Sequence, residues 1–266
     1  MKILFTICGR AGSKGFKNKN LKELNGVPIV YYTLSAIWGF FAKHPEHQIQ
    51  TVLNTDSQEL KKLVMNQDIL SPIKFVPRKN ELAGDRVAKI DVIKDTYLTM
   101  AQQEQYDVII DLDITSPVRT IEDIENVLKV YLSNTEFDVV FSVVDARRSP
   151  YFNMVERKKD GFYRKICESD FITRQETPCA YELNASIYAY SPSFLRRENL
   201  KTILDYRCGI AQMKDYLVLD IDSESDFEMM KYLHKYYCEY DVGIYKIYQM
   251  AEAQVNNKKC YNNKLL

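Results

Sequence analysis

The first 24 residues, Met1 to Leu24, read MKILFTICGRAGSKGFKNKNLKEL and determine which fold the rest of the chain can adopt. Residues 2–8 form a nearly continuous apolar run, which is typical of a parallel strand covered on both faces. Glycines and polar or cationic residues then alternate, namely Gly9, Arg10, Gly12, Ser13, Lys14, Gly15, Lys17 and Lys19. Glycines let a backbone approach a ligand closely, and lysine and arginine can face phosphate oxygens. The stretch therefore predicts a strand followed by a loop that binds a triphosphate.

Two common phosphate-binding loops do not fit this segment. Lys14 occupies the place of the second glycine of a Walker loop, and the glycines are spaced by threes, unlike those of a dinucleotide-binding G-x-G-x-x-G. The segment instead resembles the N-terminal signature of the acylneuraminate cytidylyltransferases, roughly A-R-x-G-S-K-x-x-x-x-K-N-L. The residues that match it in register are Arg10, Gly12, Ser13, Lys14, Lys19, Asn20 and Leu21, with Gly9 in place of the usual alanine. The resemblance implies that these residues bind CTP.

Composition sets broad limits on the fold and on the partners of the protein. The chain has 266 residues, of which 46% are hydrophobic, enough for one large α/β domain with an excursion or for two small domains. Lys plus Arg and Asp plus Glu number 36 each, so no net charge draws the protein to nucleic acid or to an anionic membrane. The six cysteines form no C-x-x-C pair, and the N-terminal apolar run is too short for a signal peptide or a membrane span. We therefore expect a cytoplasmic protein.

Strand-like and helix-like segments alternate along the chain. Strands are predicted at residues 2–8, 49–53, 73–76, 107–112, 137–144 and 216–219, and helices at 29–41, 59–67, 88–102, after Thr120 and at 224–240. This order predicts βαβ units and a mainly parallel sheet. Together with the resemblance it implies one domain over residues 1–240 with a Rossmann-like nucleotidyltransferase (nucleotide-diphospho-sugar transferase) fold. Residues 241–266 are expected to form a C-terminal extension, a fraying helix and tail.

Two polar segments follow predicted strands at the sheet edge where ligands bind in such folds. Residues 78–85 resemble the family pattern R-x-x-E-L-A-x-D, which implies that Arg78 and Asp85 help to hold the nucleotide base. Residues 113–120 resemble the pattern Q-P-T-S-P-L-R-T, which implies that Thr115 and Ser116 bind substrate. Asp113 departs from the usual glutamine, and an acid here could contact sugar or ribose hydroxyls, or a metal.

Residues 145–183 form a looser, aromatic and basic segment that we interpret as an excursion from the sheet, with a hairpin strand at 162–166. In the family such an excursion packs against a second subunit, which implies a homodimer. A β-ribbon lid on its own chain is the alternative, and both remain open.

The block that follows the excursion resembles R-Q-x-x-P-x-x-(aromatic)-x-x-N-G-A-I-Y. The resemblance implies that the residues that bind the acidic sugar are Arg174, Gln175, Asn184 and Tyr188. For Arg174 the physical reason is plain, because a planar guanidinium can bind a carboxylate through two hydrogen bonds.

Asp220 and Asp222 are two carboxylates at i and i+2. On an extended segment they project to the same side and can hold one Mg²⁺. They match the D-I-D pair that binds metal in the cytidylyltransferases. Ser223 and Asp226 also form a capping box, so a turn followed by a helix is a second interpretation that is compatible with the first.

The resemblance implies that CMP passes from CTP to the anomeric hydroxyl of a nine-carbon α-keto acid sugar, with release of pyrophosphate and with Mg²⁺ as cofactor. Arg10, Lys14 and Lys19 would neutralise the triphosphate, and Asp222 would accept the proton. Within the family the sequence is most similar to the CMP-legionaminic acid synthetases, while sialic acid, pseudaminic acid and Kdo stay open as substrates. The alternatives are a nucleotidyltransferase that charges a sugar 1-phosphate from another NTP, and an inert nucleotide-binding dimer.

Overall fold

The computed structural model describes residues 1–12, 15–66, 72–216 and 220–262. Within this part of the chain one seven-stranded sheet has the order β11-β7-β10-β6-β1-β4-β5. Its strands are β1 (Lys2–Cys8), β4 (Gln48–Thr55), β5 (Lys74–Pro77), β6 (Val108–Leu112), β7 (Val139–Asp145), β10 (Tyr181–Tyr190) and β11 (Cys208–Gln212). Strand β10 runs antiparallel to β6 and β7, and the other pairs are parallel. The predicted α/β fold with a mainly parallel sheet is confirmed.

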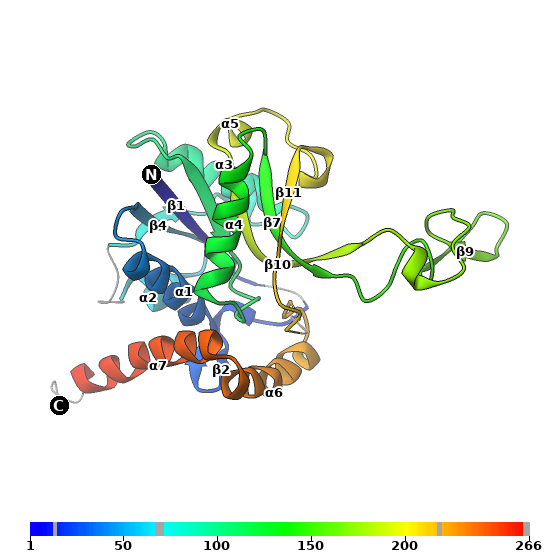
Figure 1. Ribbon diagram of the computed structural model, residues 1–266. Helices are drawn as coiled ribbons and strands as arrows, with labels where there is room; N and C mark the ends of the chain where they lie inside the picture. The colour runs from blue at the N-terminus through cyan, green and yellow to red at the C-terminus, as the bar shows by residue number, and fades with distance from the viewer. Residues whose placement is uncertain (13–14, 67–71, 217–219, 263–266) are drawn as a thin grey trace.

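Helices cover both faces of this sheet (Figure 1). One core holds Ile3, Phe5 and Ile7 of β1, while Leu4 belongs to the core on the opposite face. Because both faces are covered, every residue at the centre of β1 has to be apolar or paired, which explains its continuous apolar run. The helices that pack on the first core are α1 (Ile29–Lys43), α2 (Gln58–Met65) and α4 (Ile121–Ser133), and those on the second are α3 (Lys89–Met100) and α5 (Pro192–Leu195).

Short elements complete the body of the molecule. A small antiparallel pair joins β2 (Glu23–Leu24) and β3 (Val27–Pro28) ahead of α1. The 3₁₀ turns are η1 (Lys19–Leu21), η2 (Asn80–Leu82), η3 (Arg174–Glu176) and η4 (Ile203–Asp205). The predicted capping box of Ser223 and Asp226 is present at α6 (Glu224–Tyr240), and Thr120 and Asp123 form a second one at α4.

The C-terminal segment differs from the sequence prediction. Residues 242–262 form helix α7 (Val242–Asn262), which lies beside α1, and the buried Gln254 Nε2 donates to Ser35 Oγ at 2.7 Å. Part of α7 is thus packed against the core, and the expectation of a fraying helix is wrong for that part. The strand expected at 216–219 falls largely outside the described residues, and Tyr216 itself is not in a strand.

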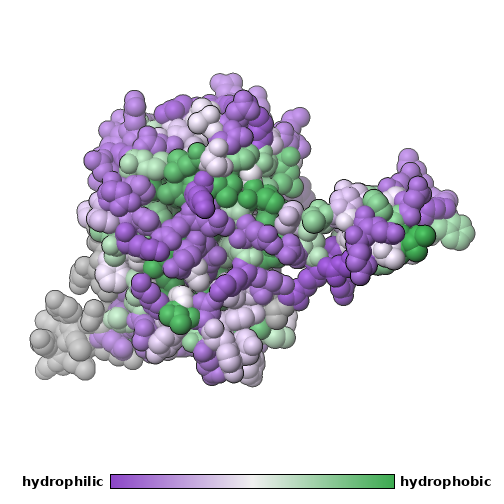
Figure 2. Space-filling view, viewed as in Figure 1, coloured by the Kyte–Doolittle hydropathy of each residue, from purple (hydrophilic) through white to green (hydrophobic). Residues whose placement is uncertain are grey.

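The excursion at residues 145–183 extends away from the body of the molecule (Figure 1). It contains the hairpin of β8 (Val155–Arg157) and β9 (Tyr163–Lys165), which confirms the predicted hairpin strand. Several large apolar side chains on it are exposed, and Figure 2 shows green patches at its far end among hydrophilic residues. These side chains are Met154, Val155, Phe162, Tyr163, Ile166 and Ile172. In the described part of the chain, no helix has the length and apolar character needed to span a bilayer.

His234 on α6 lies in the core beside α7 and carries a testable pH dependence. Burial lowers the pKa of His234 to about 4, from an ordinary value of 6.5. Below about pH 6.5 His234 therefore binds a proton in the unfolded chain, whereas in the native protein it binds one only below about pH 4. We expect the free energy of unfolding to fall by up to roughly 3 kcal/mol across this window as the pH is lowered.

The control is His234→Phe, which keeps an aromatic ring against Tyr32 and Tyr248. Urea unfolding at several pH values between 4 and 7 should give a weaker pH dependence for this variant than for the wild type. Equal slopes would show that His234 does not contribute.

Candidate functional site

A cleft of about 280 Å³ lies at the edge of the sheet where the parallel strands β1, β4, β5 and β6 end. Loops at this edge are the usual ligand-binding elements of such sheets. The cleft gathers side chains from four segments that are far apart in sequence. Among its lining residues are Cys8, Arg10, Lys19, Asn20, Arg78, Asp85, Lys89, Asp113, Thr115 and Asp220.

The loop after β1 is held close to the neighbouring strand by main-chain contacts. Gly9 N donates to Asn54 O at 3.1 Å, and a Cβ at position 9 would lie only 2.5 Å from Leu60 Cδ2. Glycine fits here without displacing Leu60, whereas the alanine that is usual in the family would require this side chain to shift. Asn20 Nδ2 donates to Arg10 O at 3.2 Å and ties the end of the loop to its beginning.

The middle of the same loop has the backbone expected of a ligand-binding turn. Gly12 has a φ of +66°, which glycine adopts without strain. Ala11 N donates to Asp56 Oδ1 at 2.8 Å. Ser13 and Lys14, which the sequence also predicts to bind the triphosphate, lie outside the described residues.

The second segment, residues 78–85, faces the first across the cleft. Arg78 Nε donates to Asn54 Oδ1 at 2.9 Å, which fixes its guanidinium at the end of β4. Asp85 accepts a hydrogen bond from Arg10 Nη1. The two predicted nucleotide-binding segments are therefore in direct contact.

Arg119 supports the third segment of the cleft, residues 113–120, from the interior of the protein. Its side chain is fully buried, and it donates to the carbonyl oxygens of Asp113 and Ser116 and, through Nε, to Ser186 Oγ at 3.1 Å. Ser116 Oγ donates to Asn184 O at 3.4 Å. The arginine and Ser116 thus hold the loop that presents Asp113.

Cations of the first loop and acids of the last segment meet at one end of the cleft. Lys19 Nζ lies 2.8 Å from Asp222 Oδ1, although 203 positions separate them. Thr115 Oγ1 lies 2.6 Å from Asp220 Oδ1, and Ile221 N donates to Thr115 O at 3.2 Å. The loop after β1 and the segment that holds Asp220 and Asp222 therefore meet in the fold, as binding of a single nucleotide by both would require.

Comparisons with known proteins agree with this geometry. The sequence model of the cytidylyltransferase family matches residues 4–259. The chain belongs to the cytidylyltransferase family. It is accordingly a CTP-dependent transferase, and the family resemblance predicted from the motifs is confirmed.

Two relatives match this cytidylyltransferase over most of its length. Post-translational flagellin modification protein B of Campylobacter coli is 35% identical over 235 residues, which cover 88% of this chain and 95% of the relative. CMP-N,N'-diacetyllegionaminic acid synthase of Campylobacter jejuni is 32% identical over 233 residues, covering 87% and 94%. Among solved structures, CMP:2-keto-3-deoxy-manno-octonic acid synthetase complexed with CTP has a TM-score of 0.61 at 14% identity and covers 89% of this chain and 99% of that chain. This last likeness concerns the fold alone.

The donor set of the cytidylyltransferase cleft fits a hard divalent cation. Asp220 lines the cleft and Asp222 follows two residues later, while Asp113 lies across the Thr115 hydroxyl from Asp220 and is paired with Lys89. Burial, and then the negative charge of Asp113, raise the pKa of Asp220. A cation would offset this repulsion, and carboxylate oxygens are the ligands that Mg²⁺ prefers.

The residues predicted to bind the sugar are not all brought together. Arg174 and Gln175 are in η3 on the excursion, where Arg174 Nη2 donates to Ala146 O at 3.1 Å, and neither is among the described residues that line the cleft. Asn184 is buried, and its Oδ1 accepts from Ser142 Oγ at 2.6 Å. Tyr188 lines a second cavity next to the cleft. The sugar-binding roles of these four residues stay predictions.

Sequence reasoning missed Lys89, which lines the cleft at the first residue of α3. In the sequence it looks like a solvated lysine on a helix. The available signal was electrostatic, because a cation in the first turn of a helix opposes the helix dipole and needs nearby anions. The structure supplies two such anions, Asp111 and Asp113.

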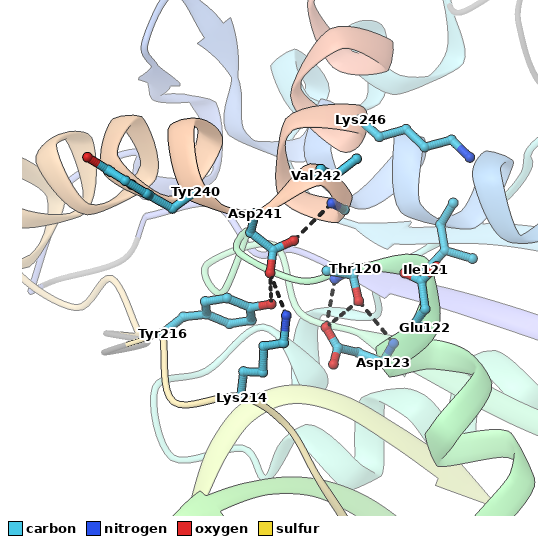
Figure 3. Close-up of a pocket in the computed structure, with 11 residues that line it drawn as sticks. Thr120, Ile121, Glu122, Asp123, Lys214, Tyr216, Tyr240, Asp241, Val242 and Lys246 are labelled. Atoms are coloured by element: carbon cyan, nitrogen blue, oxygen red, sulfur yellow. Dashed lines mark hydrogen bonds and ion pairs between the residues drawn. The ribbon is translucent and has the colours of Figure 1, made fainter.

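A separate cavity of about 600 Å³ lies between the beginnings of α4 and α7 (Figure 3). Lys214 Nζ and Tyr216 Oη both lie 2.8 Å from Asp241 Oδ2, and Gly243 N donates to Asp241 Oδ1 at 2.9 Å. Asp241 thus caps α7 and holds the segment that leads toward Asp220. Of the predicted site residues that the structure describes, none lines this cavity.

His44, Glu46 and His47 are ligand types that could hold a metal, but hydrogen bonding accounts for their arrangement. His44 Nδ1 lies 3.0 Å from Glu46 Oε1 and its Nε2 lies 2.5 Å from Glu125 Oε1. Burial acts to lower the pKa of His44, but the hydrogen bonds to these two carboxylates outweigh it and raise the pKa. The cluster is therefore explained by the hydrogen bonds of the His44 ring to two acids.

Proposed function

We propose that this enzyme transfers CMP from CTP to the anomeric hydroxyl of a nine-carbon α-keto acid sugar of the legionaminic acid type. The observation that carries the proposal is that Lys19, which lines the cleft together with Arg10 and Asp220, is in contact with Asp222. One nucleotide placed there would meet the cations and the acids together. The name of the Campylobacter jejuni relative supports a legionaminic acid as the sugar.

In this proposal the role of each cleft residue follows from its charge and position. Arg10 and Lys19, together with the predicted Ser13 and Lys14, neutralise the triphosphate, and Gly12 and Asn20 shape the loop around it. Arg78 and Asp85 hold the nucleotide on the opposite side. Positioning and the cancellation of phosphate charge supply most of the rate enhancement in such a reaction.

The chemical step forms one bond and breaks one. The anomeric oxygen bonds to the α-phosphorus of CTP, the bond from that phosphorus to the bridging oxygen breaks, and pyrophosphate carries away the electron pair. The hydroxyl proton passes to the Asp222 carboxylate. Asp220 and Asp222 are the proposed Mg²⁺ ligands, and Mg²⁺ would draw charge from the phosphates and lower the pKa of the attacking hydroxyl.

The excursion is proposed as a dimer arm that completes the sugar site of a second subunit. It extends from the body, exposes large apolar side chains, and contributes no described residue to its own cleft. Such a surface is suited to a homodimer contact. In the dimer Arg174 and Gln175 would reach the carboxylate of the sugar bound to the partner.

The proposal is tested by pyrophosphate release from the full chain with Mg²⁺, each of the four NTPs, and a panel of acidic sugars. The panel contains N,N'-diacetyllegionaminic, N-acetylneuraminic and pseudaminic acids and Kdo. We expect release with CTP and fastest release with the legionaminic acid. Release that requires ATP, GTP or UTP together with a sugar 1-phosphate, or no release with any pair, would overturn the proposal.

A further inference from the structure

Lys89 lies between two cavities of the molecule. It lines the nucleotide cleft, and it also lines an adjoining cavity of about 490 Å³ whose wall includes Tyr188 and Tyr190. No other described residue belongs to both linings. A substrate that extends from the cleft into the second cavity has to pass this lysine.

The ammonium group of Lys89 joins two carboxylates. Its Nζ lies 2.7 Å from Asp111 Oδ2 and 2.5 Å from Asp113 Oδ2. Asp111 is fully buried and accepts a hydrogen bond from Thr6 Oγ1 at 2.6 Å, so it is a fixed anchor at the end of β6. Lys89 is thereby held on one side, and it holds Asp113 on the other.

Asp113 is less buried than Asp111, with 18% of its side chain exposed toward the cleft that it lines. Its Oδ1 accepts from Thr115 N at 3.1 Å. Its other oxygen, Oδ2, contacts the Lys89 ammonium, so two donors stabilise the charged form of the carboxylate. At neutral pH Asp113 is therefore an anion, which can only accept hydrogen bonds.

The net charge of the group limits what can bind beside it. The triad alone carries two carboxylates and one ammonium, and the buried guanidinium of Arg119 also interacts electrostatically with both carboxylates. A second anion, such as the carboxylate of the sugar, would still be repelled by the Asp113 carboxylate if it approached that side chain directly. A hydroxyl group, in contrast, can donate to the carboxylate.

We propose that Lys89 is a positioning residue for the acceptor sugar, which holds Asp113 so that its carboxylate accepts a hydrogen bond from a sugar hydroxyl at the junction of the two cavities. This inference rests on the proposed function, because it takes an acidic sugar as the substrate. It explains why an acid at position 113 is compatible with a site that binds an anionic sugar. It also implies that the sugar carboxylate points away from the junction.

A double-mutant cycle tests the inference, with the variants Lys89→Met, Asp113→Asn and the pair together. If Lys89 acts through Asp113, each single change raises KM for the sugar about tenfold, since one hydrogen bond to a charged group is lost or misplaced. The double variant should also show about a tenfold increase rather than about a hundredfold, because the second change removes nothing further. The change in affinity for CTP, measured by calorimetry without sugar, should be much smaller than the change in the sugar KM.

Two further variants control for structural effects. Lys94→Met makes the same change on α3, where Lys94 donates to the Arg197 carbonyl outside the cleft, and should leave the sugar KM unchanged. Lys89→Arg keeps the charge but replaces a compact ammonium by a planar fork that cannot take the same place between two acids. It should raise the sugar KM even if Lys89→Met fails to fold.

Several outcomes would overturn the inference. An additive cycle, an unchanged sugar KM in Lys89→Met, or an unchanged sugar KM in Lys89→Arg would show that Lys89 does not act through Asp113. If the wild-type enzyme turns over CTP and sugar and the variants give any of these results, this inference alone is refuted. A wild-type enzyme that releases no pyrophosphate with any sugar refutes the proposed function and this inference with it.

Discussion

Replacing Lys19 with alanine should lower kcat for pyrophosphate release by roughly 10³-fold, the typical loss when one group that stabilises a charged transition state is removed. Lys19 lines the cleft and contacts Asp222, so its ammonium lies where phosphate charge has to be neutralised. Its pair with Asp222 is partly exposed, and we therefore expect less than about 1 kcal/mol of lost stability. Steady-state kinetics and a thermal melt measure the two effects.

Lys17→Ala is the matched control for this variant. Lys17 belongs to the same loop, its side chain is exposed, and it is not among the described residues that line the cleft. We expect its kcat to be close to that of the wild type. An equal loss in both variants would indicate that general loop charge, and not the position of Lys19, matters.

The second large effect is expected for Asp222→Asn, which keeps the size of the side chain and removes its charge. We expect kcat to fall by roughly 10²–10³-fold, because the variant lacks both the proposed proton acceptor and one proposed Mg²⁺ ligand. The Mg²⁺ concentration that gives half-maximal activity should rise. The side chain is 72% exposed, so the melting temperature should not change.

Glu224→Gln provides the comparison, since Glu224 is an exposed acid two residues further on. It should leave both the rate and the Mg²⁺ dependence as they are. If Asp222→Asn retained the full rate, Asp222 would have no part in the chemistry and another group would have to accept the proton.

The sequence predicted most elements whose apolar pattern follows directly from their place in the fold. Strand β1 is covered on both faces, and the amphipathic helix α4 begins at a capping box formed by Thr120 and Asp123. Both kinds of signal are local. They are therefore visible without knowledge of the neighbouring elements.

The elements that were missed depend on contacts with distant parts of the chain. Strand β10 buries the polar Asn184 and Ser186, and Ala185 between them has a φ of +50°, so the alternation of apolar residues is broken. Strand β11 is short and contains Gly209, whose Cβ position is filled by the Phe137 ring. For helix α7 a helix was expected but its packing was not, because part of it is anchored by the buried Gln254, a polar contact that no hydrophobic period reveals.

The candidate site shows the same difference between residues with a local sequence signal and residues that depend on distant contacts. Most of the charged site residues could be found because each belongs to a recognisable motif, namely Arg10, Lys19, Arg78, Asp85, Asp220 and Asp222. Lys89 belongs to no motif, and its importance comes from Asp111 and Asp113 on another strand end. Such a residue becomes visible only when the fold places it between its partners.

The central claim is that the loop cations and the carboxylates act on a single nucleotide in the cleft at the edge of the sheet. The most direct measurement is a crystal structure of the full chain with CTP and Mg²⁺. We predict that the triphosphate contacts Arg10 and Lys19 and that Asp220 and Asp222 bind the metal beside it. A nucleotide bound elsewhere, for example in the cavity between α4 and α7, with the cleft empty, would contradict the account.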